Sequence, residues 1–360
     1  MTHPPVTVRT FLRMLALLLV AATQSQCARQ AQPPPHILLI VLDTTRVDRL
    51  SCYGHDRPTT PHIDRLAANG RRYTRAYSTS TWTIPSHASL FTGLYPSAHG
   101  ATQASLPLTA HATTLAEALR ERGYETLAFV ENPYLDTAHQ FDQGFDYWYE
   151  SWMHREGPQP GMNRVRHEFD QAMKNRTDDR PTFTFVNLMS AHQPYMPPDF
   201  IRERLGIDPS YECPLHFHRA HYRGEKVYSD EEIRRLSLLY DGGVCHNDHL
   251  VGALLKTLRD TGMWENTIII ITSDHGENLG EHDHFDHCFA MYDQTLHIPL
   301  IIHDPSRFEP GSVDDQPTQL VDIFPTLMAI TGDAAAHPTH GIDLRQRDGR
   351  RNRVMFGEYE

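Results

Sequence analysis

The sequence predicts an α/β fold in which a mostly parallel sheet lies between two layers of helices. Two observations predict it. Short runs of β-branched and apolar residues recur along the 360-residue chain, and helical patterns separate these runs. Apolar runs without polar alternation are typical of strands that are buried on both faces, as in parallel sheets. The alternation of strand and helix therefore indicates a three-layer α/β/α sandwich.

Each predicted element is taken from one such run or pattern. The apolar runs interpreted as strands are residues 37–42, 126–130, 182–188, 267–272 and 299–302. The helical patterns are residues 61–69, 113–122, 231–260 and 318–330, and each is followed closely by a glycine, which commonly ends helices. Residues 150–180 and 195–230 are polar and without clear periodicity, which predicts long loops over a site, where specificity could lie.

The N-terminus resembles a targeting segment. Arg9 and Arg13 precede an apolar run from Met14 to Ala22, the order expected of a secretory signal. The run is too short for a membrane span, although Cys27 leaves a lipoprotein open. We therefore expect residues 1–30 to be a signal peptide or an N-terminal anchor. The protein is then exported, to the periplasm or the medium, and any membrane contact is made through that anchor.

Charge and cysteine content limit the partners. The formal net charge is −12, so the sequence predicts no nucleic-acid partner. An acidic protein can still bind an anionic ester when a metal ion inverts the local field. The five cysteines lack the spacing of a metal finger, and their pairing cannot be read from the sequence.

Two predicted strand ends carry candidate metal ligands. Asp43 directly follows the first apolar run, and Asp274 with His275 follows the run at 267–272. Ligand sites in such sheets lie beyond the carboxyl ends of the strands, so these side chains should meet there. They would offer oxygen and nitrogen ligands to a divalent cation, with zinc or manganese favoured by the imidazole and calcium or magnesium left open. The alternative is an ordinary helix cap or polar turn.

Thr83 is the candidate nucleophile and the fourth metal ligand. Pro85 suits the first turn of a helix, so Thr83 lies at a helix N-terminus, where it is either a simple cap or an activated hydroxyl. Four histidines are further candidates, and the alternative for each is a solvated loop residue. His87, His192 and His287 are assigned catalytic roles, and His192, His282 and His287 are assigned contacts with substrate oxygens or with a second metal.

The motifs around these residues resemble the sulfatase branch of the alkaline phosphatase superfamily. They are Asp43-Thr44-Thr45-Arg46 with the residues up to Gly54, Thr60-Pro61-His62, residues 85–96, Asp274-His275-Gly276-Glu277, Gly280-Glu281-His282 and residues 298–301. The resemblance covers residues 36 to 330, and it implies an alkaline phosphatase-like catalytic domain at residues 35–335. It also implies a small C-terminal subdomain, of which residues 336–360 look like only the start. That subdomain is thus expected to be missing or truncated, with residues 354–360 beginning a strand.

Several positions depart from the sulfatase pattern. Sulfatases proper carry a Cys or Ser that becomes formylglycine in a Cys/Ser-x-Pro-x-Arg motif, where this chain has Thr83, Pro85 and His87. Thr44 and His287 stand where the family usually has an Asp and a Lys. The Asp/Thr/Asp/His set is similar to superfamily members with an unmodified Thr nucleophile, such as the lipoteichoic-acid synthases and phosphoethanolamine transferases.

The sequence therefore predicts a metal-dependent hydrolase that acts through a covalent Thr83 intermediate, with phosphate esters favoured. A sulfuric ester hydrolase, arylsulfatase-like and with the same site, is the first alternative. A catalytically dead, truncated binding module is the second. The substrate is expected to be a small-molecule, glycan or lipid ester. The leaving group, the number of metal ions and the oligomeric state stay open.

Overall fold

The computed structural model describes residues 33–102, 105, 107–109, 111–153, 163–287, 290–332 and 337–359. The predicted signal or anchor at residues 1–30 lies outside these residues, as do Cys27 and Cys288. The chain from Pro35 onward forms one compact unit. Within the described part, the structure contains no helix with the length and apolar character needed to cross a bilayer.

A sheet of eight strands forms the centre of the described structure. Its order is β11-β2-β10-β7-β1-β6-β4-β5, and only β10 runs antiparallel to its neighbours. The strands are β1 (His36–Leu42), β2 (Arg71–Tyr73), β4 (Glu125–Val130), β5 (Tyr147–Glu150), β6 (Thr182–Leu188), β7 (Thr267–Thr272), β10 (Leu300–His303) and β11 (Ser312–Asp314). The predicted mostly parallel α/β fold is confirmed.

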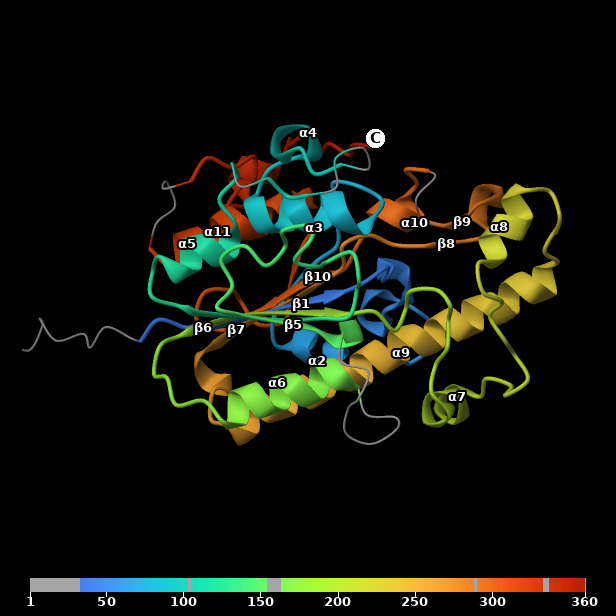
Figure 1. Ribbon diagram of the computed structural model, residues 1–360, viewed down its shortest axis with the longest axis horizontal. Coiled ribbons are helices and arrows are strands. Elements are labelled where there is room, and N and C mark those ends of the chain that lie inside the picture. Colours follow the sequence, from blue (N-terminus) through green and yellow to red (C-terminus); the bar gives the residue numbers. More distant parts are fainter. Residues whose placement is uncertain are drawn as a thin grey trace, which may run out of the picture. The chain divides into compact units, whose positions relative to one another are not determined.

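Helices cover both faces of this sheet (Figure 1). One layer contains α3 (Thr83–Thr92), α5 (Leu115–Arg120) and α11 (Ile323–Ile330), and the other contains α2 (Pro61–Ala68), α6 (Arg164–Lys174) and α9 (Asp230–Asp260). The shorter helices are α4 (Pro96–His99), α7 (Asp199–Leu205), α8 (Phe217–Tyr222) and α10 (Asp293–Leu296). Two small ladders complete the fold: β3 (Ala76–Tyr77) with β12 (Thr318–Gln319), and β8 (Asn278–Leu279) with β9 (Phe285–Asp286).

Strand β1 shows why the central strands lack polar alternation. Side chains alternate between the faces of a strand, and here each face meets a helix layer. Ile37, Leu39 and Val41 pack in the core beneath α3, α5 and α11, while Leu38 and Ile40 pack in the opposite core. Each fully buried aliphatic side chain contributes about 1.5–3 kcal/mol of transfer free energy. Burial on both sides therefore fixes β1, and with it the position of Asp43.

The predicted helix at 318–330 begins later than expected. Thr318 and Gln319 pair with β3, and a 3-10 turn at Leu320–Asp322 precedes α11. The Asp322 carboxylate accepts a hydrogen bond from the Gln319 N–H at 2.8 Å. This local bond together with the strand pairing holds Thr318 and Gln319 extended, which a helical sequence pattern does not reveal.

The two segments predicted as loops contain helices. Residues 150–180 include α6, whose Val165, Phe169 and Met173 recur at helical spacing and pack against the sheet. Residues 195–230 include α7 and α8. The prediction was wrong because the single apolar stripe of α6 is diluted by charged residues, and because α7 and α8 are too short to show periodicity.

Residues 354–359 form no strand, contrary to the prediction for the end of the chain. The backbone of Phe356 instead exchanges two hydrogen bonds with the side chain of Gln319. Two buried ion pairs, Arg350 with Asp314 and Arg353 with Asp322, hold the preceding residues against the α/β unit. The proposed start of a subdomain at residue 336 stays a prediction.

The buried carboxyl group of Asp248 allows the packing between α2 and α9 to be tested. Asp248 on α9 accepts hydrogen bonds from the N–H groups of His62 and Ile63 at 2.9 and 2.8 Å, at the start of α2. Burial raises the pKa of Asp248 to about 7. The unfolded chain loses this proton near pH 4 and the folded chain near pH 7, so the stability that this group contributes falls as pH rises between those values.

We expect Asp248→Asn to remove that pH dependence, because Asn keeps an acceptor oxygen and cannot ionise. The free energy of unfolding of the variant should rise relative to wild type by about 2–4 kcal/mol between pH 4 and pH 7. Urea unfolding at intervals across this range measures the difference. Parallel pH profiles for the two proteins would contradict the assignment.

Candidate active site and metal centre

The candidate site residues meet at the carboxyl edge of the sheet. Strands β1, β4, β6 and β7 are mutually parallel, so their carboxyl ends lie at one edge. Asp43 directly follows β1, Asn132 follows β4 by two residues, and Asp274 follows β7 by two residues. Asp43 and Asp274 thus lie together, as their positions after apolar runs predicted.

Asp43, Asp274 and His275 form a buried group that could hold a metal ion. Each offers one ligand atom, and these atoms all lie within 4.8 Å of one another. Asp43 Oδ1, Asp274 Oδ2 and His275 Nε2 are buried and make no hydrogen bond with the described residues. Such atoms are costly to bury unsatisfied, and a cation would satisfy all three. His275 Nδ1 lies 2.9 Å from the Gly276 carbonyl oxygen, which leaves the Nε2 lone pair for a metal.

Asp274 is held in its ionised form. Its burial opposes ionisation, but the neighbouring His275 and His87 and the Thr44 N–H outweigh burial and hold the pKa of Asp274 below its usual value. The N–H groups of Thr44 and His275 donate to Oδ1 at 3.1 and 2.9 Å. Thr44 has a φ of 54°, a strained conformation for a β-branched residue, in the turn from which its N–H reaches Asp274.

Asn132 connects Thr83 to Asp43. Its Nδ2 donates to Asp43 Oδ2 at 2.7 Å and to Thr83 Oγ1 at 3.1 Å. Asn187 Nδ2 donates to the same oxygen of Asp43 at 3.2 Å. Thr83 is itself buried in the first turn of α3, one residue further into the helix than predicted. The hydroxyl of Thr83 and the carboxylate of Asp43 are thereby held by one amide group.

Neither asparagine was predicted from the sequence. Asn132 lies at the end of a predicted strand, so the reasoning that selected Asp43 also applied to it. Asn187 is the one strongly polar residue near the end of the run at 182–188. A single amide side chain in an otherwise buried strand was the signal that could have indicated a site role for Asn187.

His87 lies inside the structure beside the ligands. It is fully buried one helical turn after Thr83, and its Nδ1 lies 2.9 Å from the Thr83 carbonyl oxygen and 3.5 Å from Asp274 Oδ2. The rings of Phe91 and Phe185 pack edge-on against it. The contact with Asp274 suits a residue that positions a metal ligand.

A second buried group adjoins the first. Glu277, Asp286 and His287 also bring their ligand atoms within 4.8 Å of one another. His287 Nδ1 lies 3.2 Å from Glu277 Oε1 and 2.8 Å from Asp286 Oδ1, and its ring centroid lies 4.5 Å from that of His275. Glu277 Oε2 is buried and makes no hydrogen bond with the described residues. This group can either orient His287 or hold a cation.

Asp286 is held by further side chains that the sequence analysis did not select. Gln193 Nε2 donates to its Oδ2 at 2.8 Å, and His218 Nε2 lies 3.3 Å from the same oxygen. Burial opposes ionisation, but His287 and His218 outweigh it and hold the pKa of Asp286 below its usual value. Gln193 lies five residues after the end of β6, so its position near a strand end was a signal that could have found it. His218 lies on α8, and only the tertiary structure brings it here.

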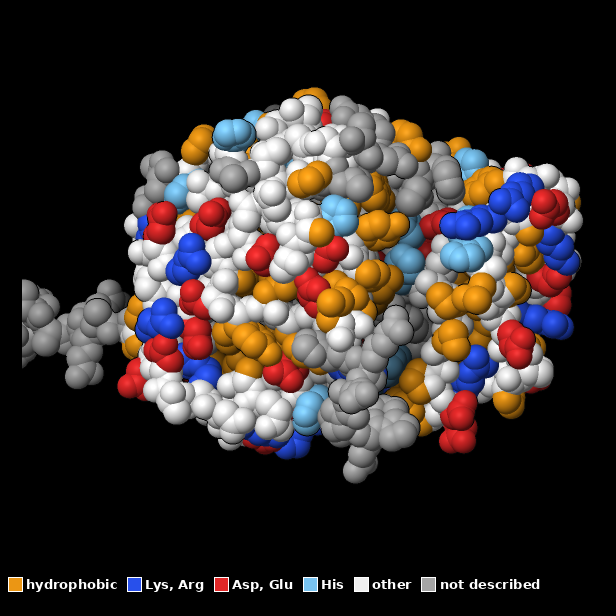
Figure 2. Space-filling model, in the orientation of Figure 1, with side chains coloured by type: hydrophobic (Ala, Val, Ile, Leu, Met, Phe, Trp, Pro, Cys, Tyr) orange, Lys and Arg blue, Asp and Glu red, His pale blue; other side chains and the backbone are white. Residues whose placement is uncertain are grey.

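His192 and His287 line an open cavity of about 490 Å³, together with residues of α8. Their ring centroids lie 5.2 Å apart. Figure 2 shows histidine side chains gathered in a hollow of the surface on the side toward α8. His282 is not brought to this cavity: it is exposed and stacks on Tyr292, with ring centroids 4.0 Å apart.

Comparison with known proteins identifies the family of this chain. The model of the Sulfatase family matches residues 35–333. The chain belongs to the sulfatase family. An arylsulfatase of Clostridium perfringens is 24% identical, over 88% of this chain and 79% of its own length. An ulvan-active sulfatase of Formosa agariphila is 27% identical over 87% of this chain, and the match spans only 64% of that relative.

A solved structure extends the comparison beyond sulfate esters. The phosphonate monoester hydrolase of Agrobacterium radiobacter is 25% identical, with a TM-score of 0.71 over 86% of this chain and 76% of that one. Members of this sulfatase family and their phosphonate-cleaving relative are ester hydrolases, and so is this chain. Sulfatases and alkaline phosphatase-like enzymes use a divalent metal ion, and the Asp43 group supplies candidate ligands for one.

The bridging role of Asn132 generates a prediction. We expect Asn132→Ala to lower both metal affinity and kcat by about 10- to 100-fold, the usual effect of removing a partner that orients a metal ligand. Metal content after dialysis against a graded chelator, and turnover at saturating metal, measure the two effects. Asn175→Ala, at the end of α6, is the control. Unchanged metal affinity in a folded Asn132→Ala protein would contradict the role.

Proposed function

We propose that the protein hydrolyses an anionic phosphate, phosphonate or sulfate ester through a covalent intermediate on Thr83. One observation carries this proposal. Three buried ligand atoms without hydrogen-bond partners converge beside a threonine hydroxyl that shares Asn132 with one of those ligands. No comparable arrangement is needed for a simple helix cap.

The chemistry assigned to Thr83 is an in-line displacement. The Thr83 Oγ1 bond to phosphorus or sulfur forms as the bond to the leaving-group oxygen breaks, and water then cleaves the Thr83 ester. A divalent ion held by Asp43, Thr83, Asp274 and His275 would lower the pKa of the Thr83 hydroxyl and neutralise charge on the ester. With two carboxylates and an imidazole among its ligands, zinc or manganese fits better than calcium.

His192 and His287 are assigned to the ester oxygens and the leaving group. His192 Nδ1 lies 2.7 Å from the Gln193 carbonyl oxygen, so this nitrogen carries a proton and Nε2 is left to act on the substrate. In its protonated form, His192 can donate the Nε2 proton to the departing oxygen. His287 is oriented by Glu277 and Asp286 at the rim of the same cavity.

The negative charge of the site affects which type of ester can bind there. Within the described structure, the carboxylates of Asp43, Asp274, Glu277 and Asp286 have no lysine or arginine partner. A substrate with one negative charge at the reacting group meets less repulsion there than a dianionic phosphate monoester. Phosphate diesters and phosphonate monoesters carry one charge, which favours them as substrates.

A sulfate ester is the second candidate, because it also carries one charge and the arylsulfatase and ulvan-active sulfatase relatives act on sulfate esters by name. Those names support a small-molecule or glycan ester as the substrate. The N-terminal sequence pattern supports export of the protein, where such esters would be met.

Substitution of Thr83 tests the nucleophile. Thr83→Ala should lower kcat by at least about 10³-fold because no covalent ester can form, whereas Thr83→Ser keeps a hydroxyl and should retain turnover. Mass spectrometry after acid quenching should find the phosphoryl or sulfuryl group on the peptide with Thr83. Full turnover in a folded Thr83→Ala protein would exclude this mechanism.

Removing the metal and restoring it with different substrates tests both the metal dependence and the ester preference. We expect chelator-treated protein to lose turnover and to regain it best with zinc or manganese. The substrates to compare are bis-p-nitrophenyl phosphate, p-nitrophenyl phenylphosphonate, p-nitrophenyl phosphate and p-nitrophenyl sulfate. Sulfate turnover above that of the phosphorus esters would move the assignment to the second candidate, and activity without metal would refute the metal-dependent proposal.

A further inference from the structure

An arginine of α8 and the arginine at its C-terminal cap line the same cavity as the candidate catalytic histidines. The cavity of about 490 Å³ is bordered by His192 and His287 and also by Arg219 and Arg223. Its volume is within the range of sites that bind whole small molecules, so it has room for more than the reacting group. Lysine and arginine side chains lie on the surface over α8, beside the hollow that contains the histidines (Figures 1 and 2).

Helix α8 is fixed relative to the catalytic centre. The Tyr222 hydroxyl donates to the Phe285 carbonyl oxygen at 2.7 Å and accepts from the Phe285 N–H at 3.1 Å. His218, on the same helix, contacts Asp286 at 3.3 Å, and Phe217 is buried with its ring 5.5 Å from that of Phe285. The arginines are therefore presented from a helix that is bonded to the strand carrying Asp286.

Arg219 and Arg223 lie four residues apart, on one face of α8 and its C-terminal cap. Both are exposed, and neither guanidinium group forms an ion pair or a side-chain hydrogen bond with the described residues. Lys226, only three residues further along, is paired with Glu232 at 2.7 Å. The chain has 45 acidic and 33 basic residues, so two neighbouring cations without carboxylate partners at a cavity are notable.

We propose that Arg219 and Arg223 bind a second anionic group of the substrate, one that is not hydrolysed. Guanidinium groups match carboxylate, sulfate and phosphate oxygens in charge and geometry. The inference rests on the proposed ester hydrolysis at Thr83 and narrows the substrates to esters with at least two anionic groups. The second anion avoids the buried carboxylates of the reacting centre because its partners lie on α8 and its C-terminal cap.

The test compares two esters of similar size, of which only one carries a second negative charge. They are the 3-carboxy-4-nitrophenyl and 3-carbamoyl-4-nitrophenyl esters of phenylphosphonic acid. The wild-type protein should prefer the carboxylate in kcat/KM by roughly three- to tenfold at low salt, the effect of one or two exposed ion pairs. The preference should shrink as ionic strength rises. In Arg219→Gln/Arg223→Gln this preference should be lost, so that kcat/KM falls more for the carboxylate ester than for the carboxamide ester.

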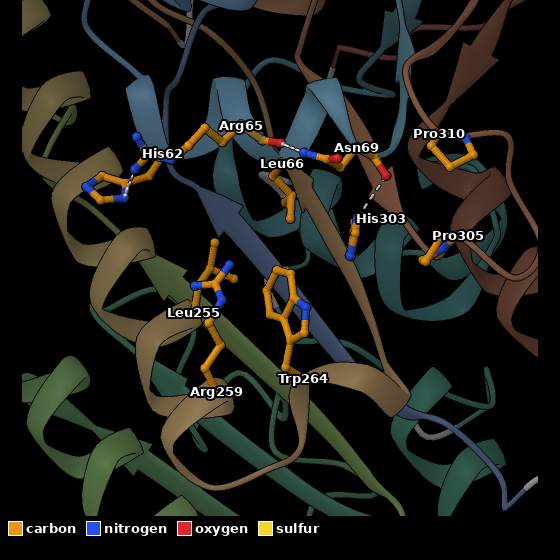
Figure 3. A pocket seen from close by; sticks show the side chains of 10 residues that line it. All are labelled: His62, Arg65, Leu66, Asn69, Leu255, Arg259, Trp264, His303, Pro305 and Pro310. Atoms are coloured by element: carbon orange, nitrogen blue, oxygen red, sulfur yellow. Dashed lines mark hydrogen bonds between the residues drawn. The ribbon is translucent and has the colours of Figure 1, made fainter.

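A charge-matched control comes from a separate pocket of about 380 Å³ (Figure 3). Arg65 and Arg259 line it with Trp264, and none of the catalytic candidates does. Arg259 lies at the C-terminal end of α9, the end remote from α8 (Figure 1). Arg65→Gln/Arg259→Gln removes the same two charges from the protein and should leave the preference intact.

Binding to Thr83→Ala separates this inference from the proposed function. Calorimetry with metal-loaded Thr83→Ala should show the same preference for the carboxylate ester, and its loss when both arginines are replaced. If wild type turns over neither ester but binding still depends on the arginines, the proposed function fails and the subsite stands. Equal binding and equal turnover of the two esters by wild type, or a preference that survives Arg219→Gln/Arg223→Gln, would overturn the subsite.

Discussion

The burial of several carboxylates at one edge of the sheet is the constraint on which the site depends. Like charges repel strongly where water is excluded, and a buried carboxylate without partners is costly. Asp43 accepts hydrogen bonds from two side-chain amides, and Asp274 accepts hydrogen bonds from two backbone N–H groups. The ligand atoms that remain without hydrogen bonds face one another, which is the arrangement that a divalent cation stabilises.

The framework around the carboxylates serves to keep them in place. Strand β1 is apolar on both faces and pairs with β6 and β7, so Asp43 cannot shift along the strand without unburying its neighbours. Asp274 lies two residues beyond β7, and the strained turn at Thr44 directs an N–H to it. Rigid strands with short connections thus bring candidate ligand atoms from distant parts of the chain within 4.8 Å of one another. This preorganisation is what catalysis by positioned charge requires.

The two sides of the active-site cavity have different electrostatic characters. The reacting centre is rich in carboxylates, which suits an ester that carries one negative charge in the presence of a cation. Helix α8 and its C-terminal cap add two arginines. They belong to a segment between β6 and α9 that is not part of the central sheet. Such segments vary without disturbing the core, so substrate specificity can change there while the chemistry proposed at Thr83 and Asp43 is kept.

The sequence by itself determined the central architecture and the main candidate ligands. Uninterrupted apolar runs predicted β1, β6 and β7, and residues that directly follow such runs in a parallel sheet must share an edge, which placed Asp43, Asp274 and His275 together. Thr83 followed from its position at a helix start. These predictions depended on local patterns and on the one rule that parallel strands align their ends.

Only the tertiary structure decided how the other residues contribute. Asn132 and Asn187 became relevant because two neighbouring strands aim their amides at one carboxylate oxygen, and Gln193 and His218 because a loop and a short helix fold over the same edge. His282, in contrast, stacks on Tyr292 at the surface although its sequence motif suggested a site role. Contacts between segments far apart in the chain are set by the packing of whole elements, so they leave no periodic pattern in the sequence. Strand burial and strand ends are set by neighbouring residues, so they do leave such a pattern.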